Sequence, residues 1–254
     1  MGRQGIGMDS IDKTSGFGAP DWGKRADAGF LASGIDPADR RGHKNLYIDT
    51  LQKTALEEAL ELKGDEVVLD FGCGSGRMTY WLAPRVRKVI GLEVTPEMIR
   101  LAEEHRKSDN VEFMLYDGAH LPDFPDPFDF ILSVGVLQIM KREQMAKTFS
   151  GLARSLKPGG RIYLIEQVSD NPDMGRPKVE DYLQVFRDSR VKCIHSYPIR
   201  KGRWWLLYLI RYRFIPKKWL PLIASWELRK CRGKERRIAY YQDYLFLTEK
   251  PGLP

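Results

Sequence analysis

The stretch that decides the fold is VVLDFGCGSG, which occupies residues 67–76. The short apolar run 67–71 predicts a buried strand, and a helical pattern follows the turn as far as Leu82. Three glycines alternate through the turn: Gly72, Gly74 and Gly76. Because glycine has no Cβ, the backbone of such a turn can pass close beneath a ligand. We therefore expect a ligand-binding corner, with simple tightening of a strand–helix junction as the alternative.

Acidic residues follow two further predicted strands. Glu93 ends the run 88–93 and comes 21 residues after Gly72, close to the interval of about 20 residues at which an acid accepts hydrogen bonds from ribose hydroxyls. Asp117 and Gly118 follow the run 111–116, where a carboxylate can accept from an adenine amine. The alternatives are a solvated glutamate and a simple turn. Together these residues predict a nucleoside pocket at the carboxyl edge of the strands.

The rest of the chain continues an alternation of strands and helices. We expect helices at 46–62, 96–105, 143–156 and 179–187, and strands at 128–134, 161–165, 191–197 and 240–248. Strands that alternate with helices imply right-handed crossovers and a parallel sheet covered on both faces. The predicted fold class is therefore a doubly wound α/β sheet.

The composition fits one domain with an appended lid, since the chain has 254 residues and 43% of them are hydrophobic. We expect an N-terminal lid or flexible segment at 1–45 and a main domain at 46–254, with an insertion at 198–238 between the last two strands. Only three cysteines occur, which disfavours a disulfide framework and favours a reducing compartment, here the cytoplasm. No metal-binding cluster and no signal peptide are expected from the sequence. A membrane span is not expected either, because the longest apolar run, 204–210, has seven residues.

Basic residues are concentrated near the C-terminus. The net charge is +7, yet residues 200–237 alone hold thirteen Lys or Arg and two Glu, so the remainder is slightly acidic. Aromatic residues are interleaved with these cations, among them Trp204, Trp205, Trp219 and Trp226. This mixture suits peripheral contact with an anionic membrane or binding of a phosphorylated ligand. A helical lid with its apolar side on the main domain is the alternative, and nucleic-acid binding is less favoured.

The order of these motifs resembles the class I S-adenosylmethionine-dependent methyltransferases of the small-molecule type. The resemblance spans residues 46–166, with 240–248 as weaker support. It rests on five motifs, at 67–76, 89–93, 116–118, 128–133 and 156–161. It implies a Rossmann-like sheet of seven strands with the last one antiparallel, and S-adenosyl-L-methionine as the cofactor.

The resemblance also implies which residues bind the cofactor. The glycines would lie under its methionine part, Asp70 would orient their turn, Glu93 would hold the ribose, and Ser133 would flank the methionine. The full set of cofactor-binding candidates is Asp70, Gly72, Gly74, Gly76, Glu93, Asp117, Gly118 and Ser133.

A nicotinamide-dependent dehydrogenase is the main rival with the same kind of sheet. Its usual turn is Gly-x-Gly-x-x-Gly, whereas residues 72–76 read Gly-x-Gly-x-Gly. In addition, Asp70 precedes the turn, and an acid after the third strand has no required place in dinucleotide binding. The pattern therefore favours a methyltransferase.

The acceptor is less well defined by the sequence. Residues 133–136 read Ser-Val-Gly-Val, where nucleobase-directed relatives carry Asn/Asp-Pro-Pro-aromatic, so we expect a small-molecule, saccharide or lipid-linked acceptor, with oxygen favoured over nitrogen or carbon. Gln138 lies in the loop after the fourth predicted strand, but a glutamine side chain cannot act as a base and could contact an acceptor only by hydrogen bonding. Catalytic candidates are Glu166, which ends the fifth strand, and His43, ahead of the first long helix. An RNA-directed enzyme and a non-catalytic cofactor-binding module are the alternatives.

Overall fold

The computed structural model describes residues 20–202, 204–232, 238 and 240–252. Its centre is a seven-stranded sheet in the order β3-β2-β1-β4-β5-β7-β6, in which β7 runs antiparallel to β5 and β6. This topology confirms the predicted fold class. The strands are β1 (Val67–Phe71), β2 (Lys88–Glu93), β3 (Val111–Leu115), β4 (Phe128–Val134), β5 (Leu156–Val168), β6 (Lys192–Lys201) and β7 (Gln242–Glu249).

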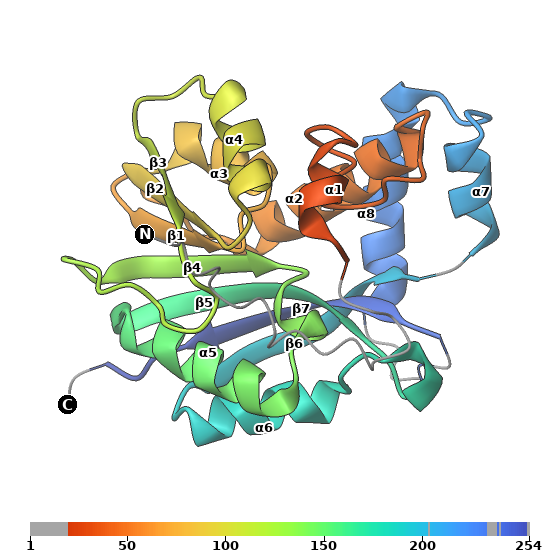
Figure 1. Ribbon diagram of the computed structural model, residues 1–254. Helices are drawn as coiled ribbons and strands as arrows, with labels where there is room; N and C mark the ends of the chain where they lie inside the picture. The colour runs from red at the N-terminus through yellow and green to blue at the C-terminus, as the bar shows by residue number, and fades with distance from the viewer. Residues whose placement is uncertain (1–19, 203, 233–237, 239, 253–254) are drawn as a thin grey trace, which may run out of the picture.

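Helices cover both faces of the sheet (Figure 1). One core lies between the sheet and α2, α3, α7 and α8, and the other lies between the sheet and α5 and α6. Val68 belongs to the first core and Leu69 to the second, because successive strand residues point to opposite faces. Both are fully buried, which explains why the strand is a continuous apolar run. The α-helices are α1 (Trp22–Ala26), α2 (His43–Ala59), α3 (Arg77–Leu82), α4 (Pro96–Glu104), α5 (Arg142–Arg154), α6 (Val179–Asp188), α7 (Trp205–Arg211) and α8 (Leu220–Cys231).

Two strands are longer than predicted because distant partners extend them. β5 begins at Leu156, which pairs with Phe128, and the turn before Arg161 is held by Lys250, which bonds both Gly159 and Gly160. β6 reaches Lys201 because β7 pairs along its whole length. Pro198 is tolerated there because β6 lies at the edge of the sheet.

The predicted insertion lies between β6 and β7, as α7, a short 3-10 helix (Lys217–Trp219) and α8. α8 packs against α2 and β6. The buried Tyr47 hydroxyl on α2 donates a hydrogen bond to the Glu227 carboxylate on α8, which also accepts the Lys201 N–H at 3.0 Å. Residues 1–19 of the predicted N-terminal segment, and 203 and 233–237 of the predicted insertion, lie outside the described residues.

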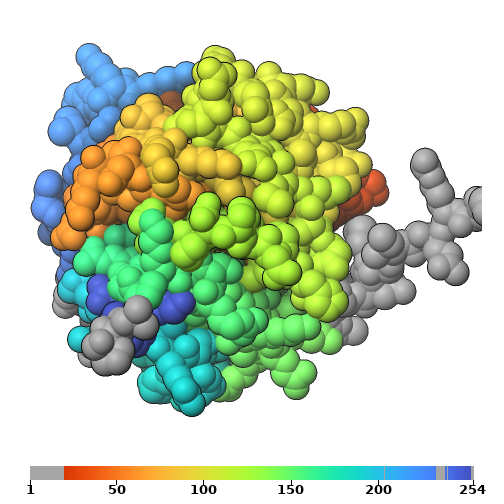
Figure 2. All heavy atoms as spheres, turned by 90° about the vertical axis from the view of Figure 1, so that its left-hand side faces the viewer, coloured from red at the N-terminus to blue at the C-terminus, as the bar shows by residue number. Residues whose placement is uncertain are grey.

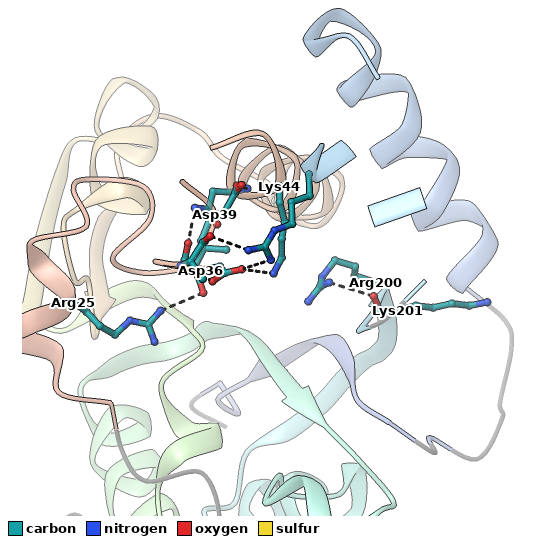
Figure 3. Close-up of polar contacts among 10 residues, drawn as sticks. Arg25, Asp36, Asp39, Lys44, Arg200 and Lys201 are labelled. Carbon is teal, nitrogen blue, oxygen red and sulfur yellow. Dashed lines mark hydrogen bonds and ion pairs between the residues drawn. The ribbon is translucent and has the colours of Figure 1, made fainter. Parts of the chain in front are cut away.

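The N-terminal segment is attached to the body through Asp36 (Figure 3). Its carboxylate accepts from Lys44 on α2 and forms an ion pair with Arg211 on α7 at 3.4 Å. Asp39 accepts the backbone N–H of Asn45 at 2.8 Å. These contacts hold residues 36–42 between α2 and the insertion. Within the described parts of the chain, no helix is both long enough and apolar enough to cross a bilayer.

Candidate functional site

A cavity of about 1070 Å³ opens at the carboxyl ends of β1 to β4. Its walls come from the segments that follow these strands, from residues 175–177 ahead of α6, and from residues 20–23 of the N-terminal segment. Small-molecule sites usually measure about 300–1,000 Å³, so the cavity has room for a nucleoside cofactor together with part of a second molecule. The lining also includes Trp22, which belongs to the predicted N-terminal lid.

Gly72 and Gly74 of the glycine turn after β1 line this cavity, whereas Gly76, the N-cap residue of α3, does not. Gly72, Gly74 and Gly76 all have positive φ, between +54° and +80°, a region that residues with a Cβ rarely adopt. A Cβ on Gly72 would lie 2.3 Å from Val136, and one on Gly76 would lie 2.9 Å from Phe113. A Cβ on Gly74, by contrast, would meet nothing within 4 Å. Gly74 lines the cavity, so a larger side chain there would enter the space that a ligand needs.

Glu93 at the end of β2 is buried and lines the same cavity. One carboxylate oxygen accepts the Gly74 N–H at 3.0 Å, and the other accepts the Val94 and Thr95 N–H groups at 2.9 and 3.0 Å. These bonds fix the carboxylate. An ionised carboxylate has about four acceptor positions, so one remains for a ribose hydroxyl. Thr95 stands at the N-cap of α4 but makes no side-chain capping bond.

Asp70 lies at the base of the cavity, 2% exposed. Its carboxylate accepts the Thr79 hydroxyl at 2.6 Å. Burial raises the pKa of Asp70 to about 6, although the Thr79 bond and the nearby Arg77 act in the opposite direction. The group can therefore change its charge just below neutral pH, when a ligand alters its surroundings.

Asp117 and Gly118 line the far end of the cavity, beyond β3. The Asp117 carboxylate accepts the backbone N–H groups of Ala119 and His120, each at 2.8 Å. The His120 and Ala119 N–H groups lower the pKa of Asp117 to about 2. Asp117 therefore stabilises a turn, which was the alternative to an adenine contact. It is also an ionised hydrogen-bond acceptor beside the cavity, as a contact with an adenine amine requires.

The structure corrects the placement of Ser133. Its register with Phe71 puts it on the α5 side of the sheet, where it is fully buried, and the cavity is lined instead by the next residues, Val134 and Gly135. Its hydroxyl has no hydrogen-bond partner within the described part of the protein. Ser133 is therefore not positioned to flank the methionine directly.

Glu166, a predicted catalytic candidate, has another role in the structure. It is 1% exposed and does not line the cavity. Its carboxylate accepts the backbone N–H groups of Val136, Leu137 and Gln138 at 3.0–3.2 Å, so it holds the loop that follows β4. Burial raises the pKa of Glu166 to about 8, against the opposite effect of these three donors. Glu166 contacts the loop after β4, and its own side chain does not line the cavity.

His43, the other catalytic candidate, begins α2 and is also outside the cavity walls. Its Nδ1 lies 3.3 Å from Nε of Arg213 and 3.4 Å from the Arg41 carbonyl. The residue joins the N-terminal segment to the insertion. None of the four histidines, all of which the structure describes, is among the lining residues.

The sequence interpretation missed a cationic group in the cavity. Lys141 and Arg142 follow β4, and Arg176 follows β5; all three line the cavity. Arg142 forms an ion pair with Asp181 at 3.5 Å, and Arg176 donates to Gln167 at 3.0 Å. Their positions beyond the carboxyl ends of two predicted strands were a usable signal, although the loops that carry them have no motif.

These residues fit S-adenosylmethionine on structural grounds. The cradle at Gly74 leaves open space where a Cβ would stand, as the methionine part requires. Glu93 keeps acceptor capacity for the ribose, and Asp117 presents an ionised carboxylate beside the cavity for the adenine. The three features follow β1, β2 and β3, which are adjacent in the sheet.

Comparison with known proteins finds methyltransferases. Residues 68–160 match the family described as "Methyltransferase domain". Methyltransferase GfsG of Streptomyces halstedii is 29% identical over 174 residues, which cover 65% of this chain and 59% of GfsG. The 18S rRNA (guanine-N(7))-methyltransferase bud23 of Schizosaccharomyces pombe is 29% identical over 132 residues, covering 47% of this chain and 49% of bud23.

A solved structure shows the same fold. Phosphoethanolamine N-methyltransferase 2 of Haemonchus contortus, in complex with phosphomonomethylethanolamine and S-adenosylhomocysteine, has a TM-score of 0.61 at 18% identity, covering 79% of this chain and 52% of that chain. The present chain therefore spans only about half to three fifths of the relatives described here. The glycine turn, the two strand-end acids, the sheet order and the match over residues 68–160 together support a class I S-adenosylmethionine-dependent methyltransferase.

Proposed function

We propose that this protein transfers the methyl group of S-adenosylmethionine to an oxygen atom of a small-molecule, saccharide or lipid-linked acceptor. The observation that carries the proposal is the division of the cavity lining. Groups suited to a nucleoside follow β1, β2 and β3, and a different set of side chains follows β4 and β5. Because β4 and β5 continue the sheet beyond β1, the second set would face the methionine end of the cofactor, where the acceptor has to bind.

The bound cofactor supplies a methyl group on a positively charged sulfur, which is already activated for displacement. The contribution of the chain is alignment, which can account for about 7–11 kcal/mol of a barrier when the reacting atoms are held in line. Glu93 and Asp117 would hold the two ends of the nucleoside, and the open space at Gly74 would admit the methionine part. Glu166 keeps the loop after β4 in position for the acceptor.

The second set of lining residues includes one acid, Asp181, which is paired with Arg142, and these apolar and cationic side chains: Val136, Ile139, Met140, Lys141, Arg142 and Arg176. Cations beside an oxygen acid favour its ionised form, and an ionised oxygen attacks without a base. No histidine is available among the described lining residues to remove a proton. The set therefore supports an acceptor with an acidic hydroxyl or carboxyl group on a partly apolar body.

The test is S-adenosylhomocysteine formation by the full chain with matched panels of phenols, carboxylic acids, neutral alcohols and amines. We expect turnover with acidic oxygen acceptors and no turnover by a Gly74→Val variant, which lacks the cofactor space. Arg176→Gln should raise the acceptor KM and leave cofactor affinity unchanged. Turnover confined to amines would overturn the oxygen assignment, and cofactor binding without turnover on any panel would favour a non-catalytic module.

An RNA acceptor is the second candidate, favoured by the rRNA-directed relative and by the charge of +11 over residues 200–237. Binding through several phosphate contacts would make RNA affinity fall steeply as salt rises. Methylation of RNA by the wild type, lost in the Gly74→Val variant, would establish this candidate and displace the small-molecule proposal.

A further inference from the structure

Both helices of the insertion carry exposed apolar side chains in addition to buried ones. On α7, Leu207 and Ile210 are buried against the body, whereas Trp205, Tyr208 and the C-cap residue Tyr212 form an exposed stripe at helical spacing. A surface helix of a soluble domain normally turns charged or polar residues outward, so the outer stripe is unusual.

The same arrangement continues through α8. Its inner side, which includes Leu220, Ala224 and Leu228, belongs to the core, while Leu222 and Trp226 are exposed. Seven of the nine exposed large hydrophobic residues in the described parts of the chain lie between positions 205 and 226. We call these seven the aromatic surface: Trp205, Tyr208, Tyr212, Phe214, Trp219, Leu222 and Trp226.

Three residues of the aromatic surface expose more than two thirds of their area to solvent. Trp205 is 68% exposed, Leu222 is 71% exposed and Phe214 is 73% exposed. In the space-filling view, the blue atoms of the insertion form an outer corner of the molecule (Figure 2). Exposed apolar side chains that gather on one part of a surface commonly mark an interaction site.

The charges around the aromatic surface identify its partner. Lys217 and Lys218 are exposed between the two helices, and Arg229 and Lys230 are exposed in the last turn of α8. Between Lys201 and Glu227 the sequence contains no acidic residue. Tryptophan and tyrosine side chains prefer the interface of a bilayer, and neighbouring Lys and Arg side chains are attracted to anionic headgroups.

The aromatic surface is also held firmly on the body of the protein. Tyr47 on α2 bonds Glu227 on α8, and Arg211 on α7 forms its ion pair with Asp36. The residue before Asp36, Ile35, accepts a hydrogen bond from Arg25 at its carbonyl at 3.2 Å (Figure 3). Arg25 lies on α1, which also carries the cavity residue Trp22. A partner on the aromatic surface would therefore be held in a defined orientation relative to the cavity.

We propose that the aromatic surface docks the protein on an anionic lipid bilayer, with its aromatic rings at the headgroup level and the surrounding Lys and Arg on the anionic lipids. The insertion would lie in the interface and would not cross the membrane. This placement would bring the cavity close to acceptors that are dissolved in the bilayer or linked to lipid.

The test is flotation of the full chain with vesicles of phosphatidylcholine alone or mixed with phosphatidylglycerol, at low and high salt. We expect partition onto the anionic vesicles at low salt and little onto the neutral ones. Lys217→Gln/Lys218→Gln should weaken partition about 30-fold, since each basic residue contributes about 1 kcal/mol near an anionic surface. Trp205→Ser/Phe214→Ser/Trp219→Ser should weaken it by at least about tenfold through the lost apolar burial.

Matched controls lie elsewhere on the protein. Lys107→Gln/Lys147→Gln removes the same charge from exposed positions outside the insertion, and Leu115→Ser removes an apolar residue that is 54% exposed on β3, where it also lines the cavity. Both variants should partition like the wild type. The Lys107→Gln/Lys147→Gln variant and the insertion variants should also keep the thermal midpoint and the affinity for S-adenosylhomocysteine of the wild type. Equal partition of all variants, or absence of the wild type from anionic vesicles, overturns the proposal. Concentration-dependent dimers or salt-sensitive RNA binding in place of vesicle binding would assign the aromatic surface to those partners.

Discussion

The Glu93 carboxylate accepts the backbone N–H of Gly74 at 3.0 Å, so the residue expected to hold the ribose also holds the turn expected to hold the methionine part. The two residues are 19 positions apart and come from the ends of adjacent strands. A single side chain therefore connects the cofactor contacts on β1 to those on β2. This connection makes the pocket sensitive to small changes at either residue.

Glu93→Ala should lower the affinity for S-adenosylhomocysteine about 10- to 100-fold, because it removes hydrogen bonds to a charged group, worth about 1.5–3 kcal/mol each, and releases the Gly74 N–H. Glu93→Gln should lose less, since one amide oxygen still accepts. Titration calorimetry measures both. Unchanged binding by the folded alanine variant would mean that the ribose lies elsewhere.

Gly74→Val should abolish cofactor binding, because the side chain would enter the cavity from a residue with φ of +54°. The matched control is Gly159→Val, at a φ of +75° with nothing within 4 Å and outside the cavity lining. Both variants carry backbone strain of about 1–3 kcal/mol, so thermal midpoints should fall in both. Only the first should lose binding in calorimetry. Equal affinities in the two variants would contradict the assigned cradle.

Cofactor binding should release protons near pH 6. The pKa of Asp70 is raised by burial to about 6, so about half of the free protein carries this proton at that pH, and a cationic sulfonium and ammonium group nearby would drive it off. The stability of the folded protein depends on pH in the opposite direction to the cofactor affinity. Asp70 favours the folded state fully below its ordinary pKa of 3.8, and this contribution is lost as pH rises through about 6.

The measurement for Asp70 is calorimetry of S-adenosylmethionine binding at that pH in two buffers with different heats of ionisation. We expect a buffer-dependent heat for the wild type that disappears in Asp70→Asn. The affinity of the wild type should also rise from acidic to neutral pH. A heat that does not depend on the buffer would show that Asp70 keeps its charge state on binding.

Local patterns predicted that the cofactor candidates share one edge of the sheet. Gly74 and Asp117 follow short apolar runs, Glu93 ends one, and all three line the same cavity because parallel strands bring their carboxyl ends to one edge. The bounds of β1, β2 and β4 were predicted for the same reason, because their buried residues are contiguous in the chain.

The acceptor half was not predictable in this way. Glu166 is engaged by N–H groups about 30 positions earlier, and Arg213 approaches His43 across 170 positions, so neither contact has a local signature. Both residues carry titratable groups near a strand end or the predicted lid, which is the only feature that favours them in the sequence. In the structure, both residues form hydrogen bonds that hold loops in place. The cations that line the acceptor half lie on loops whose sequence has no recognisable spacing.

Glu166→Gln should slow turnover while cofactor affinity stays near that of the wild type, because the amide replaces one of the acceptors that hold the Val136–Gln138 backbone, and its NH₂ group opposes an N–H donor. The free energy of unfolding should change with pH in a characteristic way. The folded pKa of Glu166 is raised by burial from 4.5 to about 8, so the glutamate favours folding most below 4.5 and loses that contribution as pH rises through about 8. Urea unfolding of both proteins across this range should therefore show the wild type losing stability relative to the variant as pH rises. A constant difference would mean that Glu166 stays ionised throughout, held by its three backbone donors.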